Sequence, residues 1–313
     1  MIRSQAKEGA PVQPDNDLAE KTILVTGASG GIGLEVARML AEGGARVVAA
    51  VRDPQRGAAA LASVSEGVEI LPLDVSSLAS IHTAAQDYHA KHSALDVLVN
   101  NAGVAVSGRR RCSVDGHEIT WATNVLGPFA LTQALLPALH AADAPRVVNV
   151  GSSAYGYGKM VWNDLEFECR RFRGGPAYAS SKLALLLFTR ELARREARLA
   201  ANCVHPGGIA TGIWRELPAL VRAILMRILP PPSRGALPVV HVATAPELAH
   251  VSGRFFHGMR ERDVSAAAKN DAAAAQLWDI LAAQCAAQRE PAPPHGPAAA
   301  AANRTGTEGR CGG

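Results

Sequence analysis

Aromatic side chains are scarce in this sequence. Phe, Trp and Tyr make up 4% of its 313 residues, and the formal net charge is only +4. Proteins that bind nucleic acids usually combine a basic face with aromatic side chains that contact the bases. The densest basic run, residues 109–111, consists of three arginines, and we interpret it as a solvated loop. We therefore expect no nucleic-acid partner.

Long apolar runs are also missing. No uninterrupted apolar stretch reaches the roughly 18 residues that a transmembrane helix needs, and the polar first 20 residues lack the apolar core of a signal peptide. Residues 217–229 come nearest but contain Arg222 and Arg227. We interpret them as part of a lid over an apolar pocket rather than as a helix lying on a membrane surface. The sequence predicts a cytoplasmic protein without a transmembrane segment.

Cysteine and histidine show no pattern typical of a disulfide framework or a metal site. The five cysteines are odd in number and none form a C-x-x-C pair, which disfavours both disulfides and structural zinc. A reducing cytoplasm fits this usage. His117, His205 and His241 lack the spacing of metal ligands. We expect no bound metal.

The organisation of the chain is that of one large domain with two tails. Residues 1–20 and residues 289–313, which are rich in Ala, Pro and Gly, are predicted to be disordered. Between them, residues 21–288 alternate apolar runs with helical patterns. This alternation predicts an α/β fold, a single doubly wound parallel sheet of about seven strands with helices on both faces. The ligand crevice of such a sheet lies beyond the carboxyl ends of its strands.

The expected elements follow from these runs. The long helical stretch at 116–142 contains Pro128 and Pro137, so kinks or breaks are expected there. Strands are predicted at 22–25, 46–51, 68–73, 95–100, 146–150, 202–205 and 253–256, and helices at 32–42, 78–91, 116–142 and 177–197.

A glycine-rich turn joins the first strand to the first helix. Gly27, Gly31 and Gly33 lie in the segment 26–33, where glycine permits a tight turn and a close approach of backbone to a pyrophosphate. The N-terminus of the helix that follows offers free N–H groups and a partial positive charge. The sequence therefore predicts a dinucleotide site at this turn.

Beyond this turn the sequence resembles the short-chain dehydrogenase/reductase family, whose cofactor turn reads Thr-Gly-x-x-x-Gly-Ile-Gly. The segment 100–103 matches the family's Asn-Asn-Ala-Gly, and Tyr178 and Lys182 match its Tyr-x-x-x-Lys. The resemblance covers residues 20 to 285, and the stretch 146–207 is similar to the retinol-dehydrogenase-like branch. It implies a Rossmann-type fold, and a homodimer or homotetramer built through the helices at 116–142 and 177–197.

The cofactor implied by the resemblance is NADP(H) in preference to NAD(H), because Arg52 follows the second strand, where an arginine faces the 2′-phosphate. Alternatively, Arg52 is a surface charge and Asp53 caps a turn; Gly30 also stands where the family usually has a further basic residue. Asp74 faces the adenine or caps the next helix. The full set of implied cofactor contacts is Gly27, Ser29, Gly31, Ile32, Gly33, Arg52, Asp74, Val75, Asn101, Ala102, Gly103, Tyr178, Lys182, Pro206, Gly207 and Thr211.

The chemistry expected at this site is proton transfer coupled to hydride transfer. Tyr178 and Lys182 are four residues apart on a predicted helix and so share one face. A nearby ammonium favours the phenolate and lowers the pKa of the phenol, which makes Tyr178 a general acid or base. By resemblance, Ser152 binds the substrate oxygen, with Ser153 as a competitor, and Asn124 anchors a water linked to Lys182.

Two apolar or aromatic segments, residues 154–176 and a lid at 209–232, are expected to cover the cleft. We therefore expect a lipophilic alcohol, ketone or aldehyde as substrate; alternatively, these side chains only pack the lid. A different function is a non-catalytic dinucleotide sensor with the same fold. A sugar-nucleotide epimerase or dehydratase would need a larger C-terminal domain.

Overall fold

The computed structural model describes residues 18–64, 68–209 and 228–287. Residues 1–17 of the predicted N-terminal tail, the predicted C-terminal tail, most of the predicted lid, Trp214 and Thr211 lie outside these residues. Leu18, at the end of the predicted N-terminal tail, is buried. Every helix within them is too short or too polar to cross a membrane.

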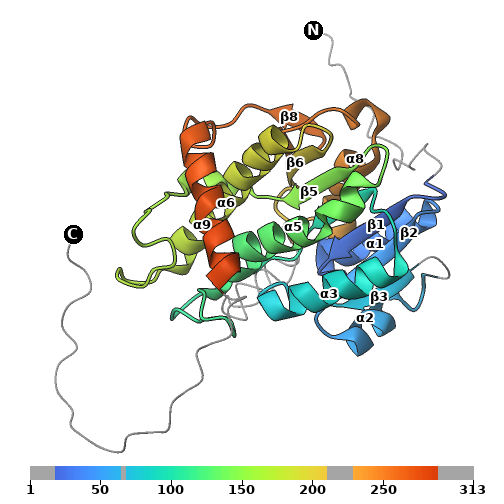
Figure 1. Ribbon diagram of the computed structural model, residues 1–313, viewed down its shortest axis with the longest axis horizontal. Coiled ribbons are helices and arrows are strands. Elements are labelled where there is room, and N and C mark those ends of the chain that lie inside the picture. Colours follow the sequence, from blue (N-terminus) through green and yellow to red (C-terminus); the bar gives the residue numbers. More distant parts are fainter. Residues whose placement is uncertain (1–17, 65–67, 210–227, 288–313) are drawn as a thin grey trace, which may run out of the picture.

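The core of the fold is a single sheet in the order β3-β2-β1-β4-β5-β6-β7-β8 (Figure 1). The order reverses between β1 and β4, which creates the switch point where doubly wound sheets bind ligands. The seven expected parallel strands are confirmed, and a three-residue antiparallel strand adds to them at the edge. The strands are β1 (Thr22–Thr26), β2 (Arg46–Val51), β3 (Val68–Pro72), β4 (Val97–Asn100), β5 (Arg146–Val150), β6 (Ala200–His205), β7 (Phe255–His257) and β8 (Arg260–Arg262).

Helices cover both faces of this sheet. Successive residues of a strand point to opposite faces, so each strand contributes apolar side chains to two separate cores. Leu24 and Leu98 belong to the core under α3 (Leu78–Lys91), α5 (Gly127–His140) and α6 (Gly174–Arg195). Their neighbours Ile23 and Val99 belong to the core under the other layer. That layer comprises α1 (Gly31–Glu42) and α8 (Pro232–Thr244), with α2 (Pro54–Leu61) beside them.

The predicted helix at 116–142 runs without a gap from 119 to 140 and contains a π-helical turn near its start. It consists of α4 (Ile119–Trp121), the π-helical turn η1 (Ala122–Leu126) and α5. Pro128 lies in the first turn of α5, where it supplies no N–H to the preceding turn, and this favours a widened helix there. Pro137, by contrast, is accommodated inside α5. This π-helical turn contains Asn124.

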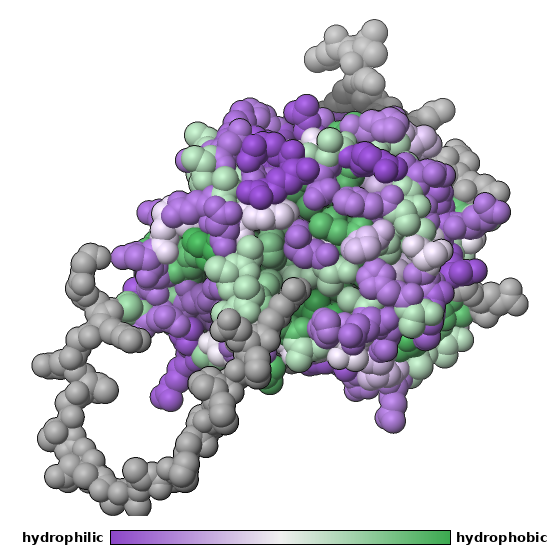
Figure 2. Space-filling model, in the orientation of Figure 1, coloured by the Kyte–Doolittle hydropathy of each residue, from purple (hydrophilic) through white to green (hydrophobic). Residues whose placement is uncertain are grey.

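The helix α9 (Asp271–Ala287) packs across α6 and toward α5 (Figure 1). The Trp278 ring lies 5.0 Å from the ring centre of Phe129 in α5 and 6.1 Å from that of Phe188 in α6. Figure 2 shows this face as mostly hydrophilic, with apolar patches over α5 and α9. A homodimer or homotetramer built through the face of α6 that α9 covers would therefore have to include α9 in the interface or displace it.

Candidate functional site

The glycine turn packs tightly against the segment that follows β4. Gly27 and Gly31 have positive φ angles of 69° and 58°, a region that favours glycine. A Cβ atom on Gly27 would lie 3.1 Å from the Cα of Ala102, and one on Gly33 would overlap the Asn101 side chain and the Gly27 carbonyl. The turn therefore requires backbone without side chains at both positions.

Thr26 holds these two segments together. Its hydroxyl oxygen accepts hydrogen bonds from the backbone N–H groups of Asn101 and Ala102, both at 3.0 Å. The Asn101 side chain in turn donates to the Thr26 carbonyl at 2.8 Å. No side chain caps α1, and its first turn has no acidic residue. Its N–H groups thus suit an anionic pyrophosphate.

The structure shows the Asp53 cap that one interpretation of the Arg52–Asp53 pair contains. Asp53 caps α2 and accepts a 3.0 Å hydrogen bond from the backbone N–H of Arg56, while Arg52 is exposed at the end of β2. Asp74 accepts from the backbone N–H of Ser76 at 2.9 Å, and Ser77 rather than Asp74 caps α3. The helix-capping alternative for Asp74 is therefore wrong.

The described residues of the predicted site gather at the carboxyl ends of the parallel strands. They follow β1 (Gly27, Ser29, Gly31, Ile32, Gly33), β2 (Arg52), β3 (Asp74, Val75), β4 (Asn101, Ala102, Gly103), β5 (Ser152) and β6 (Pro206, Gly207), with Tyr178 and Lys182 in the first half of α6 and Asn124 in η1. This is the edge at which a doubly wound sheet binds its ligand.

Tyr178 meets Ser152 rather than Ser153. The Ser152 hydroxyl lies close enough to the Tyr178 hydroxyl to lower the pKa of the phenol, and it accepts a hydrogen bond from the backbone N–H of Ala154 at 3.2 Å. The Ser153 hydroxyl lies instead 3.3 Å from Nε2 of His205. The structure thus brings together the phenol and the serine that a reducible carbonyl group would need.

The buried environment changes the acid–base properties of this site. Desolvation raises the pKa of Tyr178, and the nearby Ser152 hydroxyl opposes that rise. The expected lowering by Lys182 is not found: its Nζ lies 5.7 Å from the Tyr178 ring centre and donates to the Val150 carbonyl at 2.9 Å. Desolvation lowers the pKa of Lys182 itself to about 8. The lysine is therefore mostly protonated at pH 7.

Asn124 uses its side chain to hold the segment after β4. Its Oδ1 accepts from the Val104 N–H at 2.9 Å, and its Nδ2 donates to the Val104 carbonyl at 2.9 Å and to the Ser181 hydroxyl at 3.0 Å. A Cβ atom on Gly103 would lie 3.3 Å from Asn124 Oδ1 and 3.6 Å from Lys182 Nζ. Asn124, Gly103 and Lys182 therefore converge.

A buried polar network behind the site was not anticipated from the sequence. Asn100 Nδ2 donates to Asn149 Oδ1 at 2.9 Å, and Asn149 Nδ2 donates to the Thr189 hydroxyl at 2.9 Å. It joins the neighbouring strands β4 and β5 to α6. The available signal was Asn149 itself, a polar residue between Val148 and Val150 in a buried strand.

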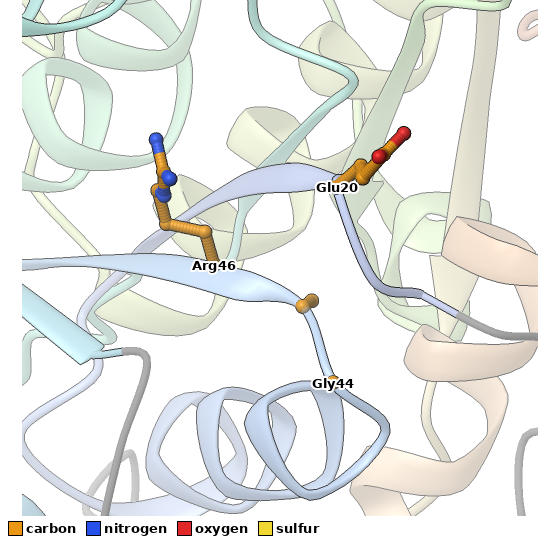
Figure 3. Close-up of a pocket in the computed structure, with 4 residues that line it drawn as sticks. Glu20, Gly44 and Arg46 are labelled. Atoms are coloured by element: carbon orange, nitrogen blue, oxygen red, sulfur yellow. The ribbon is translucent and has the colours of Figure 1, made fainter.

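Two further features of the described residues bear on the site. No three His, Cys, Asp or Glu side chains among them gather in a way that would hold a metal ion. A surface hollow lined by Glu20, Gly44, Ala45 and Arg46 (Figure 3) lies at the amino-terminal ends of β1 and β2. That is the opposite end of the sheet from Tyr178, so the hollow takes no part in the chemistry.

Comparison with known proteins agrees with this geometry. Residues 21–220 match the short chain dehydrogenase family model. The chain is 37% identical to mouse retinol dehydrogenase 12, over 83% of this chain and 84% of that protein. It is 34% identical to human retinol dehydrogenase 13, over 82% of each.

Solved structures show the same fold. An uncharacterised protein from Mycobacterium paratuberculosis superposes with a TM-score of 0.71 at 34% identity, covering 86% of this chain and 95% of that one. The NADP complex of Pseudomonas aeruginosa RhlG gives 0.63 at 29% identity, covering 77% and 95%. The chain belongs to the short-chain dehydrogenase/reductase family, in which it is similar to the retinol dehydrogenases. It is an oxidoreductase that acts on CH–OH groups.

Proposed function

We propose that this protein is an NADP(H)-dependent oxidoreductase that interconverts a lipophilic alcohol and the corresponding aldehyde or ketone, with Tyr178 as its general acid and base. The observation that carries this proposal is the proximity of the Ser152 and Tyr178 hydroxyls after the carboxyl end of β5, close enough for Ser152 to lower the pKa of the phenol. They lie at the same edge of the sheet as the uncapped N-terminus of α1 and the glycine turn. The nicotinamide cofactor would supply or accept the hydride.

Each residue has a distinct role in this mechanism. In reduction, Tyr178 donates its phenolic proton to the substrate oxygen, and in oxidation the phenolate accepts that proton. Ser152 donates a hydrogen bond to the same oxygen and so fixes its position. Lys182, whose ammonium donates to the Val150 carbonyl, would contact the bound cofactor. Asn124 holds the Val104 backbone and α6 in register.

Two observations support NADP(H) as the cofactor. Asp53 is engaged as a helix cap, which leaves exposed Arg52 as the charged side chain at the end of β2 that remains for the 2′-phosphate. Solved relatives in complex with NADP(H) include proteins from Shigella flexneri and Escherichia coli, each 26% identical to this chain.

The lipophilic substrate is supported by the relatives named retinol dehydrogenases and by the segment between Ser152 and Tyr178. Part of that segment is packing: the Phe167 ring is buried and lies 5.6 Å from that of Phe172, and Tyr155 packs against Phe255. Tyr157 is 85% exposed and remains to contact an apolar ligand.

The test is a screen of NADPH oxidation against long-chain, cyclic and small polar aldehydes and ketones, repeated with NADH. We expect turnover with the lipophilic compounds and a preference for NADPH. The Tyr178→Phe variant should lower kcat by about 10²–10⁴-fold with unchanged NADPH binding, and Tyr88→Phe, at a core tyrosine of α3, serves as the matched control. Unchanged turnover by Tyr178→Phe would instead favour the non-catalytic dinucleotide sensor.

A further inference from the structure

The carboxylate of Glu166 joins three parts of the chain that are far apart in sequence. Its Oε1 accepts hydrogen bonds from His117 Nδ1 at 2.9 Å and from Gln284 Nε2 at 2.8 Å, and its Oε2 accepts from the backbone N–H of Glu118 at 2.7 Å. The Glu166 carbonyl accepts from Nε of Arg110 at 2.8 Å. Glu166, which lies in the segment between Ser152 and Tyr178, is thereby hydrogen-bonded to the loop before α4 and to α9.

This cluster is largely shielded from solvent. The side chains of His117 and Glu166 are 16% and 12% exposed, so solvent screens their attraction less than that of a surface pair. The Glu166 carboxylate raises the pKa of His117 against the effect of desolvation, with smaller contributions from Asp115 and Glu168. Glu118, which is itself buried, and Arg110 are the other charged groups beside the pair.

The same segment is attached at its start to the catalytic helix. The Lys159 N–H donates to the Ser180 hydroxyl at 3.2 Å, and that hydroxyl donates to the Lys159 carbonyl at 2.8 Å. In the middle of the segment, the Asp164 carboxylate accepts from the backbone N–H groups of Glu168, Cys169 and Arg170. Residues 158–173 thus form an ordered unit with two anchors, Ser180 next to Tyr178 and the cluster around Glu166.

The distal anchor also reaches the helix that carries Asn124. Gln284, which donates to Glu166, accepts a 3.1 Å hydrogen bond from the Trp121 indole. Trp121 ends α4, and Asn124 lies in the π-helical turn that follows. A displacement of Glu166 would therefore affect the segment that follows Ser152. Through Gln284 and Trp121 it would also affect α4 and the π-helical turn that carries Asn124.

We propose that Glu166 is a positioning residue for the substrate: with His117 it holds residues 158–173 as a fixed wall of the substrate site, and this wall sets the selectivity for bulky carbonyl compounds. The inference rests on the proposed function. Because the clamp includes an ion pair, it weakens when His117 loses its proton. Binding of bulky substrates should therefore weaken as the pH rises above the ordinary pKa of histidine, about 6.5, through the raised pKa of His117.

The experiment compares Glu166→Ala and Glu166→Gln with Glu168→Gln, a control at an exposed glutamate in the same segment. For Glu166→Ala we expect KM for a long-chain aldehyde to rise about tenfold relative to KM for a short one. The kcat and the NADPH dissociation constant, measured by fluorescence, should change less than twofold. Glu166→Gln should show a smaller rise that does not vary with pH, and Glu168→Gln should keep the wild-type ratio of the two KM values at pH 6.

A second variant keeps the inference testable if Glu166→Ala does not fold. His117→Asn retains an amide donor for Glu166 without a titrating group, so KM for the long-chain aldehyde should lose the pH dependence expected of the wild type. An unchanged ratio of the two KM values in Glu166→Ala, or an unchanged pH profile in His117→Asn, overturns this inference alone. A wild-type chain that binds NADPH and reduces no carbonyl compound overturns the proposed function as well.

Discussion

The ammonium group of Lys182 donates a 2.9 Å hydrogen bond to the carbonyl oxygen of Val150, the last residue of β5. The lysine side chain is buried, and its desolvation lowers its pKa to about 8 from 10.5. A buried charge with one backbone acceptor costs folding free energy. The lysine is thus kept at a position where it opposes folding, as residues that serve function often do.

Replacing Lys182 should therefore stabilise the protein while it abolishes activity. The shift of the pKa corresponds to about 3 kcal/mol against folding at pH 7, and loss of the bond to Val150 offsets about 1 kcal/mol of this. We expect Lys182→Met to raise the unfolding free energy by about 2 kcal/mol in urea titrations without cofactor. Lys91→Met, at an exposed lysine paired with Glu69, should give no gain. A destabilised Lys182→Met would contradict the proposed cost.

The advantage of Lys182→Met should depend on pH. Between the folded pKa of about 8 and the unfolded value of 10.5, the unfolded wild-type chain binds more protons than the folded one, so wild-type stability rises with pH in this window. Below pH 8 the difference between variant and wild type should be constant, and from pH 8 to 10 it should shrink. A difference that does not vary over this range would show that desolvation of Lys182 is not its cause.

The glycine turn offers a matched pair of substitutions. A Cβ atom on Gly33 would overlap Asn101 and the Gly27 carbonyl, whereas one on Gly30 has nothing within 4 Å and its φ of 173° is open to any residue. Gly33→Ala should abolish detectable NADPH binding and lower stability by about 2 kcal/mol through overpacking. Gly30→Ala should retain both, as checked by calorimetric titration and thermal unfolding. Equal behaviour of the two variants would remove the close-packing argument.

Cofactor preference should change with the charge beside the 2′-phosphate. Arg52→Ala should lower kcat/KM for NADPH by about 10–100-fold and leave that for NADH nearly unchanged. Because Gly30 is open to a side chain, Gly30→Arg should instead increase the preference for NADPH. The measurement is kcat/KM with both cofactors at one saturating carbonyl substrate. Equal losses with NADPH and NADH in Arg52→Ala would contradict the assignment.

The network of Asn100, Asn149 and Thr189 should be strongly coupled. Asn149→Leu leaves buried polar groups of both neighbours without this partner, and we expect a loss of about 2–3 kcal/mol in unfolding free energy. Adding Thr189→Val removes the hydroxyl to which Asn149 donated, so the double variant should lose less than the sum of the single variants. Additive losses would show that the bonds contribute independently.

Several elements could be predicted from the sequence because their signals are local. The strands at 46–51 and 146–150 and the helix at 78–91 have the predicted limits, since apolar runs and helical periodicity reflect neighbouring residues. Helix α9 was not singled out. Its alanine-rich sequence has no clear apolar stripe, and only its packing on Phe129 and Phe188 shows which side faces inward.

The chemistry of the site was predictable as a set of residues but less so as a set of interactions. The four-residue spacing of Tyr178 and Lys182 places them on one helical face whatever surrounds them. Whether the ammonium lowers the phenol pKa depends on distances and burial that are contributed by β5, η1 and α6 together. The fold directs Lys182 toward Val150 and buries Tyr178, so the phenol pKa is raised instead.

The amino-acid sequence alone thus determined the α/β alternation, the glycine turn and the spacing of the motif residues, because backbone conformation and helical or strand periodicity depend on residues close together in the chain. The tertiary structure alone decided that the Lys182 ammonium donates to the Val150 carbonyl, and that Glu166 binds His117 and Gln284. These contacts join segments separated by up to 118 positions, and no local pattern encodes a pairing at that separation.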